Sequence, residues 1–450
     1  MKSSRADSPI RIDMLNGGLF RKILMFALPL MASGILQQSF NSIDVAVVGR
    51  FASSQALAAV GSNGMIISIM VNLFLGISVG ANVVISNYIG QRNEQGIRKA
   101  VRTVSFIALW SGLLLLVLGV SLARPILELM NTPHDVIDLA TLYLRIYFLG
   151  MPFMMIYNFG AAILRSMGDT KRPFYSLIAA GIINTGLNLV LVIGFEMSVA
   201  GVAIATVASN IVSASIIVFL LLREKEPFRL EWKKITVERN EFRHMLRIGV
   251  PAGVQGMVFS FANIFVQSSI NGFGSDAVAG SAAALNYEYY CFFVISAFAQ
   301  AAVAFVSQNY GAGQIDRCKK AFRQCMFLSF LGCGLLNGLI VWQKGIFIGI
   351  FTSNPDVFHY AALRLQCVLL FQFLASSYEI SGAALRGYGY SMTPTVFTIF
   401  GTCVLRLVWI YTVAPRLGTF DGLLYVYPLS WVVTGIAVWI AYAVIQRRVR

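Results

Sequence analysis

Charged residues are scarce in this chain of 450 residues, at 12% of the total, whereas 57% of the residues are hydrophobic. Soluble proteins carry about 25% charged residues, so the composition argues against a chain that folds in water. Histidine occurs only at His134, His244 and His359. None of the three is paired with a candidate nucleophile, which argues against a membrane enzyme.

Cysteine is also infrequent, with six residues that all lie in the second half of the chain. No two of them form a CxxC pair and none lies beside a histidine cluster, so neither redox chemistry nor a metal site is indicated. We expect the thiols to pack as small apolar side chains. They are Cys291, Cys318, Cys325, Cys333, Cys367 and Cys403.

Long apolar runs, in contrast, recur along the whole chain. Each run reaches about 18 residues or more, which is enough for a helix to cross a bilayer. The sequence therefore predicts an all-α polytopic membrane protein. We expect twelve spans, at 20–48, 56–86, 99–122, 136–163, 173–195, 198–222, 244–270, 277–309, 319–342, 357–384, 392–415 and 422–445.

The net charge of +15 is unevenly distributed between the loops. If the N-terminus lies inside, the segments on that side carry 28 of the 35 Lys and Arg residues, and the opposite side carries four. Basic loops stay on the cytoplasmic side of a membrane. We therefore predict a protein of the cytoplasmic membrane with both termini in the cytoplasm. Anionic lipid headgroups suffice as partners for this charge, so no nucleic acid is expected.

The two halves of the chain resemble each other. YNFGAAILRSMGDTKRP (157–173) and YEISGAALRGYGYSMTP (378–394) share several residues at an offset of 221, and further pairs recur at an offset of 222. The pairs are Tyr157/Tyr378, Ala162/Ala383, Leu164/Leu385, Arg165/Arg386, Gly168/Gly389, Pro173/Pro394, Pro29/Pro251, Asn41/Asn263, Asn87/Asn309 and Tyr88/Tyr310.

Six spans in each repeat is an even number, so both repeats enter the membrane from the same side and are parallel rather than inverted. We expect an N-terminal lobe at 1–222, a charged cytoplasmic linker at 223–243 and a C-terminal lobe at 244–450. Two such six-helix bundles facing a central cleft are typical of a transporter.

The acid Asp44 lies inside the first predicted span, where an ionisable side chain is by default a functional candidate. Gln37, Asn41 and Asp44 are spaced along one face of the helix, which favours a face turned toward a wet cavity or a partner helix. Alternatively, Asp44 extends to the outer interface near Arg50. Pro29 removes a backbone donor from the same helix, which indicates either a bending element or a static kink.

The fifth and sixth spans also carry polar pairs, Asn184 with Asn188 and Thr206 with Asn210, which either bind an ion or hold helices together. In the second half the polar candidates are Glu379, Glu288, Asn263, Gln255 and Arg406. Glu379 is either a cation site or is neutralised by an arginine such as Arg406. Arg145 and Arg364 occupy near-equivalent places, so we expect them to share a structural role.

Together these motifs resemble the multidrug and toxic compound extrusion (MATE) transporters. The resemblance covers nearly the whole chain, through FALPLMASGILQQSFNSIDVAVVGR, LRSMGDTKRP, LRGYGYSMTP and SQNYGAG. It implies a V-shaped pair of six-helix bundles. It also implies antiport of bulky, often cationic organic compounds outwards against inward protons or sodium ions.

In one branch of that family, an ion site in the first lobe combines a helix 1 Asp with Asn-x-x-x-Asp on helix 5 and a Thr on helix 6. Asp44, Asn184 and Thr206 match this pattern, whereas Asn188 stands where the branch has its second Asp. A single carboxylate among amides offers a sodium ion few strong ligands, so we expect proton coupling, with sodium as the alternative. Another branch places carboxylates on helices 7 and 10, a pattern that Glu379 does not match well.

No cofactor and no metal are expected apart from a monovalent cation at Asp44. The expected partners are small organic cations or amphiphilic drugs and membrane lipids, and the expected assembly is a monomer. The main alternative is a lipid-linked oligosaccharide flippase of the same fold, which would line its cleft with cationic residues. A major-facilitator antiporter is less well matched, because GQRNEQGIRK (90–99) lacks the basic Gly-Asp-Arg loop of that class.

Overall fold

The computed structural model describes residues 11–231 and 234–449, and these residues form helices without any β-strand. Residues 1–10, 232–233 and 450, which belong to the expected lobes and linker, lie outside the described residues. Eleven helices are long and apolar enough to cross a membrane, and one bent pair of shorter helices raises the number to as many as twelve. The prediction of an all-α polytopic membrane protein is confirmed.

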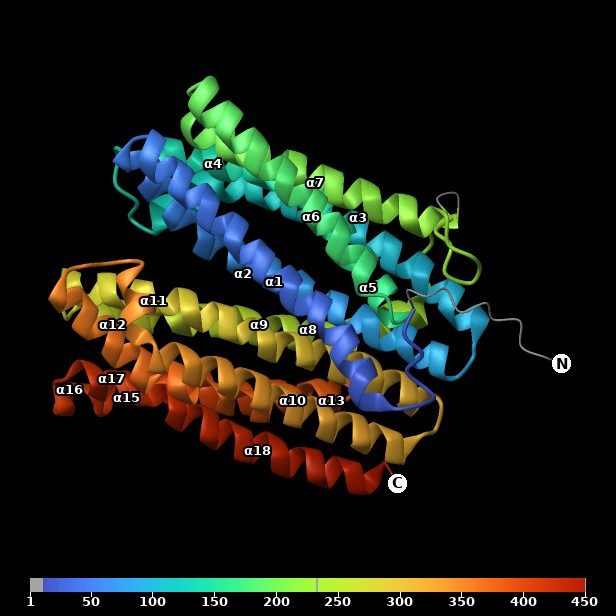
Figure 1. Cartoon of the computed structure of the whole chain (residues 1–450). Coiled ribbons are helices and arrows are strands. Elements are labelled where there is room, and N and C mark those ends of the chain that lie inside the picture. Colours follow the sequence, from blue (N-terminus) through green and yellow to red (C-terminus); the bar gives the residue numbers. More distant parts are fainter. Residues whose placement is uncertain (1–10, 232–233, 450) are drawn as a thin grey trace. The chain divides into compact units, whose positions relative to one another are not determined.

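The first half of the chain contains the helices α1 to α7 (Figure 1). The bent pair is α4 with α5, which meet at 45° and correspond to the predicted span 136–163. A short π-helix, η1, continues α6 without a break. The bounds are α1 Leu19–Phe51, α2 Ser54–Gly90, α3 Glu94–Leu129, α4 Ile137–Leu149, α5 Met151–Ser166, α6 Lys171–Asn188, η1 Leu189–Gly194 and α7 Ser198–Leu222.

The second half contains α8 to α18, with a second π-helix, η4, between α14 and α15 (Figure 1). The bounds are α8 Arg239–Asn271, α9 Ser275–Gly311, α10 Ile315–Trp342, α11 Lys344–Gly349, α12 Pro355–Cys367, η3 Leu369–Ala375, α13 Ser376–Gly387, α14 Met392–Thr398, η4 Ile399–Val404, α15 Leu405–Thr412, α16 Ala414–Leu417, α17 Phe420–Leu424 and α18 Val426–Arg448.

The chain divides by its internal contacts into two compact units. Unit 1 contains the residues up to Asp13 together with Ala32–Val250, and unit 2 contains Met14–Met31 together with the chain from Pro251 onward. Two of the boundaries therefore fall inside the continuous helices α1 and α8, beside Pro29 and at Pro251. This division differs from the expected lobes at 1–222 and 244–450. Proline removes one backbone hydrogen bond. Each helix therefore stays continuous but lacks one hydrogen bond near the place where its packing partners change.

The internal repeat is visible in the helices themselves. α1 and α8 each contain 33 residues, and α2 and α9 each contain 37. Gly168 and Gly389 both have a positive φ, at 85° and 89°. Each ends a helix with the same bond, since the Asp169 N–H donates to the Leu164 carbonyl and the Tyr390 N–H to the Leu385 carbonyl. This left-handed cap favours glycine, which explains the pair Gly168/Gly389.

Within unit 1, α2 and the first part of α8 approach closely through two glycines. A Cβ atom on Gly249 would lie 2.4 Å from the Ile77 Cα, and one on Gly80 would lie 2.3 Å from the Met245 carbonyl oxygen. Both atoms belong to the backbone and cannot swing away. The two helices therefore pack by backbone contact, as small residues allow in membrane proteins.

Replacing Gly249 with Ala is expected to lower the free energy of unfolding by about 1–3 kcal/mol, because the methyl group forces two backbones apart. Thermal unfolding of the purified protein in detergent would measure the effect. The matched control is Gly338→Ala on α10, where a Cβ would meet no atom within 4 Å. That control is expected to be neutral or stabilising, since Ala favours a helix. Equal midpoints for the two variants would contradict the close approach.

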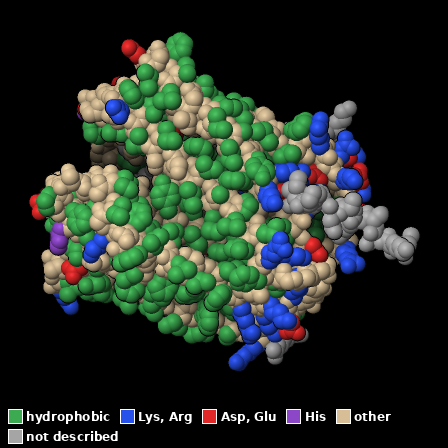
Figure 2. Space-filling view, viewed as in Figure 1, with side chains coloured by type: hydrophobic (Ala, Val, Ile, Leu, Met, Phe, Trp, Pro, Cys, Tyr) green, Lys and Arg blue, Asp and Glu red, His purple; other side chains and the backbone are tan. Residues whose placement is uncertain are grey.

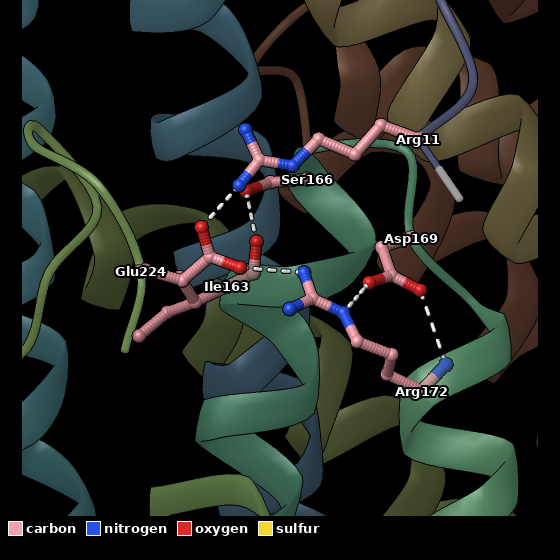
Figure 3. A network of polar contacts seen from close by, with 6 residues as sticks. All are labelled: Arg11, Ile163, Ser166, Asp169, Arg172 and Glu224. Carbon is pink, nitrogen blue, oxygen red and sulfur yellow. Dashed lines mark hydrogen bonds and ion pairs between the residues drawn. The ribbon is translucent and has the colours of Figure 1, made fainter. Parts of the chain in front are cut away.

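Most of the ion pairs that the structure describes lie at helix ends and in loops. On the face shown in Figure 2, hydrophobic side chains cover most of the surface and Lys and Arg gather mainly at the right of the view, as is typical of a membrane protein whose basic residues lie on one side. Figure 3 shows such a network in unit 1, in which the Glu224 carboxylate accepts from both Arg11 and Arg172 and the Asp169 carboxylate accepts from Arg172. These bonds join the segment before α1 and the start of the linker to the first turn of α6 and, through Arg172, to the loop between α5 and α6.

Candidate functional site

Asp44 on α1 is buried in unit 1, where 8% of its surface is exposed. Its carboxylate accepts a short hydrogen bond from the side-chain amide of Asn188, the last residue of α6. The same Asn188 nitrogen lies 3.4 Å from the Asn184 side-chain oxygen, one turn earlier on α6. Asn184 and Asn188 are buried as well. The structure thus brings together three of the predicted site residues, Asp44, Asn184 and Asn188.

The approach of α1 to α6 depends on a missing side chain. A Cβ atom on Gly181 would lie 1.7 Å from the Phe40 ring, so only glycine admits Phe40 against α6. Gly181 and Phe40 lie one turn before Asn184 and Asp44 on their helices. This contact sets the distance between the helices at which the carboxylate reaches the amide. The π-helix η1 begins directly after Asn188, and π-turns are frequent at functional sites.

The hydrogen-bonding capacity of the Asn188 amide is only partly satisfied. Its nitrogen serves both Asp44 and Asn184, whereas its oxygen is buried and has no hydrogen-bond partner among the described residues. An unsatisfied buried oxygen is destabilising and is available to a proton donor or a cation. The site therefore combines one carboxylate, one free amide oxygen and no arginine or lysine partner in the described contacts.

The other predicted residues of this site are not joined to Asp44. The Thr206 hydroxyl donates to the Val202 carbonyl of its own helix, at 3.0 Å. Gln37 and Asn41 are exposed although Asp44 is buried. Of the predicted polar face of the first helix, only Asp44 is therefore packed against a partner helix, and Gln37 and Asn41 lie at the surface of unit 1.

Two tyrosines of α4 belong to the surroundings of Asp44 and were not predicted. Tyr143 and Tyr147 lie within electrostatic range of the Asp44 carboxylate, and their rings stack with centroids 5.8 Å apart. Their spacing of four residues in YLRIY places them on one face of a helix. That spacing was the available signal. Between these residues, Arg145 points outward and is exposed.

In unit 2, Glu288 is not an open ion site. Its carboxylate accepts from the Arg364 Nε at 2.5 Å and from Nη2 at 3.0 Å, and both residues of this pair are buried. Arg364 also donates to the Ser281 hydroxyl, and the Gln372 amide donates to the Glu288 backbone carbonyl at 2.9 Å. The expected shared role of Arg145 and Arg364 is wrong, since one is exposed and the other is a buried ion-pair partner.

Glu379 lies on α13 and is partly buried. Of the two alternatives for Glu379, a cation site or a carboxylate near an arginine, the structure places Arg386, two turns later on the same helix, within electrostatic range of its carboxylate. The Arg386 Nη2 donates to the Gln255 side-chain oxygen at 2.6 Å. Gln255 and Glu379 thus belong to the surroundings of one arginine.

The remaining candidates, Arg406 and Asn263, contact each other. The Arg406 Nη1 lies 3.5 Å from the Asn263 side-chain oxygen, and Nε lies 3.3 Å from the Ser430 hydroxyl. Among the residues that the structure describes, no three His, Cys, Asp or Glu side chains are placed to hold a metal ion. The six cysteines are buried free thiols.

Comparison with known sequences gives the family. The family model MatE matches residues 29–190 and 251–412, which together make up more than half of the chain. The chain belongs to the MatE family. The two matched segments are separated by 222 residues at each end, which confirms the predicted internal repeat. MatE proteins are transporters and not enzymes, so this chain is a membrane transporter.

Named relatives of this MatE chain cover most of its length. It is 30% identical over 389 residues to the probable multidrug resistance protein YoeA of Bacillus subtilis (strain 168), covering 85% of this chain and 84% of the relative. It is 27% identical to the probable multidrug resistance protein NorM of Thermotoga maritima, covering 86% and 84%. A solved outward-facing multidrug resistance MATE transporter has the same fold, with a TM-score of 0.89 at 20% identity over 97% and 98% of the two chains.

Proposed function

We propose that this MatE transporter exports bulky, often cationic organic compounds from the cytoplasm by alternating access, in exchange for inward protons. In this proposal Asp44 is the coupling carboxylate, both termini are cytoplasmic and the protein acts as a monomer in the cytoplasmic membrane. The names of the relatives in B. subtilis and T. maritima, both probable multidrug resistance proteins, support export of drugs.

The observation that carries the proposal is the setting of Asp44. A carboxylate that is buried at membrane depth without a cationic partner favours its neutral form, whereas contact with water favours its anion. A change in the surroundings of Asp44 therefore changes its affinity for a proton. An ion drives a conformational cycle only through such a difference between two states.

Protons fit this site better than sodium ions. Asn188 presents its nitrogen to Asp44, whereas a sodium ion needs oxygen atoms on all sides. Thr206 directs its hydroxyl to its own helix, so it offers no hydrogen-bonded contact to Asp44. A proton requires only the carboxylate itself. Asp44, Asn184, Asn188 and Thr206 could hold sodium only after the amide of Asn188 turned over.

The flippase alternative is less well supported. A flippase for a pyrophosphate-linked lipid needs several free cationic side chains along its path. Of the three intramembrane arginines, Arg364 is neutralised by Glu288, which leaves Arg145, exposed on α4, and Arg406, buried on α15. These two belong to different units, so the three arginines do not form a cluster of free cations in either unit.

Efflux of ethidium from reconstituted vesicles tests the proposal. We expect a proton gradient alone to drive uphill transport by the wild-type protein, and a sodium gradient alone to drive none. A protonophore should abolish the proton-driven transport, which controls for leakage of the dye. Uphill transport with sodium alone would exclude the proton as the coupling ion.

A further inference from the structure

Arg406 is the largest of the fully buried side chains that the structure describes, with 1% of its surface exposed. It lies on α15 just after the π-helix η4, inside the candidate span Met392–Leu417. A guanidinium has five N–H donors. The hydrogen bonds to Asn263 and Ser430, at 3.5 and 3.3 Å, are long ones. The third nitrogen, Nη2, is buried and has no hydrogen-bond partner among the residues that the structure describes.

The charge of Arg406 is not neutralised within the described part of the chain. No carboxylate of residues 11–231 or 234–449 is recorded within ion-pair distance of it, and the buried acid Glu288 is already bound by Arg364. The rings of Tyr427 and Phe259 lie 4.5 and 5.2 Å from the guanidinium. Two rings compensate a buried cation only in part, because desolvation of an unpaired charge is costly. A site with this charge is therefore incomplete without an anion.

The internal repeat allows this cation to be compared with the site in unit 1, which carries the opposite charge. At the offset of 222 that pairs α1 with α8, Asn263 corresponds to Asn41. The position equivalent to Asp44 is Val266, which is buried and apolar. Equivalent helices thus present a carboxylate with amides in unit 1 and a guanidinium with an amide in unit 2.

Only the Asn263 side chain separates the Nη1 side of the guanidinium from the surface of unit 2. Asn263, which accepts its Nη1 bond, is itself exposed. Phe259 is partly exposed one turn before Asn263 on α8. A ligand that displaces the Asn263 side chain would meet Nη1 and Nη2 together, with an aromatic ring at its flank. A guanidinium binds carboxylate, sulfonate or phosphate oxygens through two such nitrogens.

We propose that Arg406 binds the anionic group of a transported compound, with Asn263 and Phe259 at its side. The substrates of this transporter then include aromatic organic anions and zwitterions as well as cations. The proposal rests on the export of organic compounds argued above and adds a substrate class to it.

Binding of two dyes to the purified protein in detergent, followed by fluorescence anisotropy, tests this assignment. Fluorescein is an aromatic anion, and rhodamine 123 is a cation built on the same xanthene ring system. We expect Arg406→Gln to weaken fluorescein binding by at least about tenfold while rhodamine 123 binding changes by less than about twofold. The control Arg145→Gln removes the same charge at an exposed position and should bind both dyes as the wild type does.

Asn263→Asp provides a second variant that keeps the guanidinium. The new carboxylate has the shape of the amide and supplies the missing counter-ion, so the variant should fold and should also lose at least about tenfold in fluorescein affinity. Wild-type fluorescein affinity in either folded variant would overturn the assignment. Displacement of fluorescein by phosphatidylglycerol, with no displacement by an excess of benzoate, would overturn it in favour of a lipid headgroup.

Failure of this test is separable from failure of proton coupling. Asp44→Asn leaves the Arg406 site untouched and should bind fluorescein as the wild type does. If Asp44→Asn loses proton-driven efflux but still binds fluorescein, the result bears on the coupling role of Asp44 and leaves the Arg406 assignment unaffected. If Arg406→Gln loses fluorescein binding but still exports ethidium, the result bears on the Arg406 assignment and leaves proton coupling at Asp44 unaffected.

Discussion

Vesicles that contain Asp44→Asn are expected to show no uphill efflux of ethidium under a proton gradient. The asparagine has the shape of the aspartate and its side-chain oxygen can still accept from Asn188, as the carboxylate does. It cannot exchange a proton, so the cycle loses the difference in affinity on which coupling depends. Ethidium binding should stay within about threefold of the wild type, because the change leaves size and shape unaltered.

Two further variants make this result specific. Asp44→Glu keeps a titratable carboxyl and should retain part of the uphill efflux. Glu379→Gln removes another intramembrane acid, one that lies near Arg386, and should leave coupling intact. Uphill efflux by Asp44→Asn at the wild-type rate would show that the coupling group lies elsewhere in the chain.

The candidate site shows what helical spacing can and cannot predict. Asn184 and Asn188 lie on one face of α6, as their spacing predicts, and Asn188 joins Asn184 to Asp44. The same spacing placed Gln37 and Asn41 on the face of Asp44, but only Asp44 is buried, whereas Gln37 and Asn41 are exposed. Periodicity assigns residues to a face, whereas burial depends on where the neighbouring helix comes closest. On α1 that place is set by Phe40 against Gly181.

The fold was predictable where it depends on hydrophobic length alone. The twelve predicted spans follow from apolar runs and recur as helices, with the span 136–163 bent at Gly150 between α4 and α5. The division into units was not predictable in this way. It falls inside α1 and α8, where the chain stays helical and only its packing partners change. Pro29 and Pro251 marked those places, but a proline does not reveal on which body each half of a helix packs.

Pairing of charges that lie far apart in the chain was also not predictable from the sequence. Glu288 and Arg364 are separated by 76 residues, so no local pattern joins them, and Glu288 was expected as a candidate for ion coupling. Its carboxylate is instead fully engaged with a buried arginine. Such a pair holds helices together rather than exchanging ions. A structural role and a coupling role for Glu288 predict different results for the same substitution.

Glu288→Gln is expected to lower the free energy of unfolding by about 3–5 kcal/mol, because it leaves the buried Arg364 without its counter-ion. For a unit of this size the thermal midpoint should fall by roughly 6–20 °C. Unfolding of the purified protein in detergent measures the shift. Replacing both partners, Glu288→Leu with Arg364→Met, should recover most of the stability, since a matched apolar pair needs no counter-ion. A coupling role would give the opposite pattern, with Glu288→Gln stable but unable to transport ethidium uphill and the double variant no better.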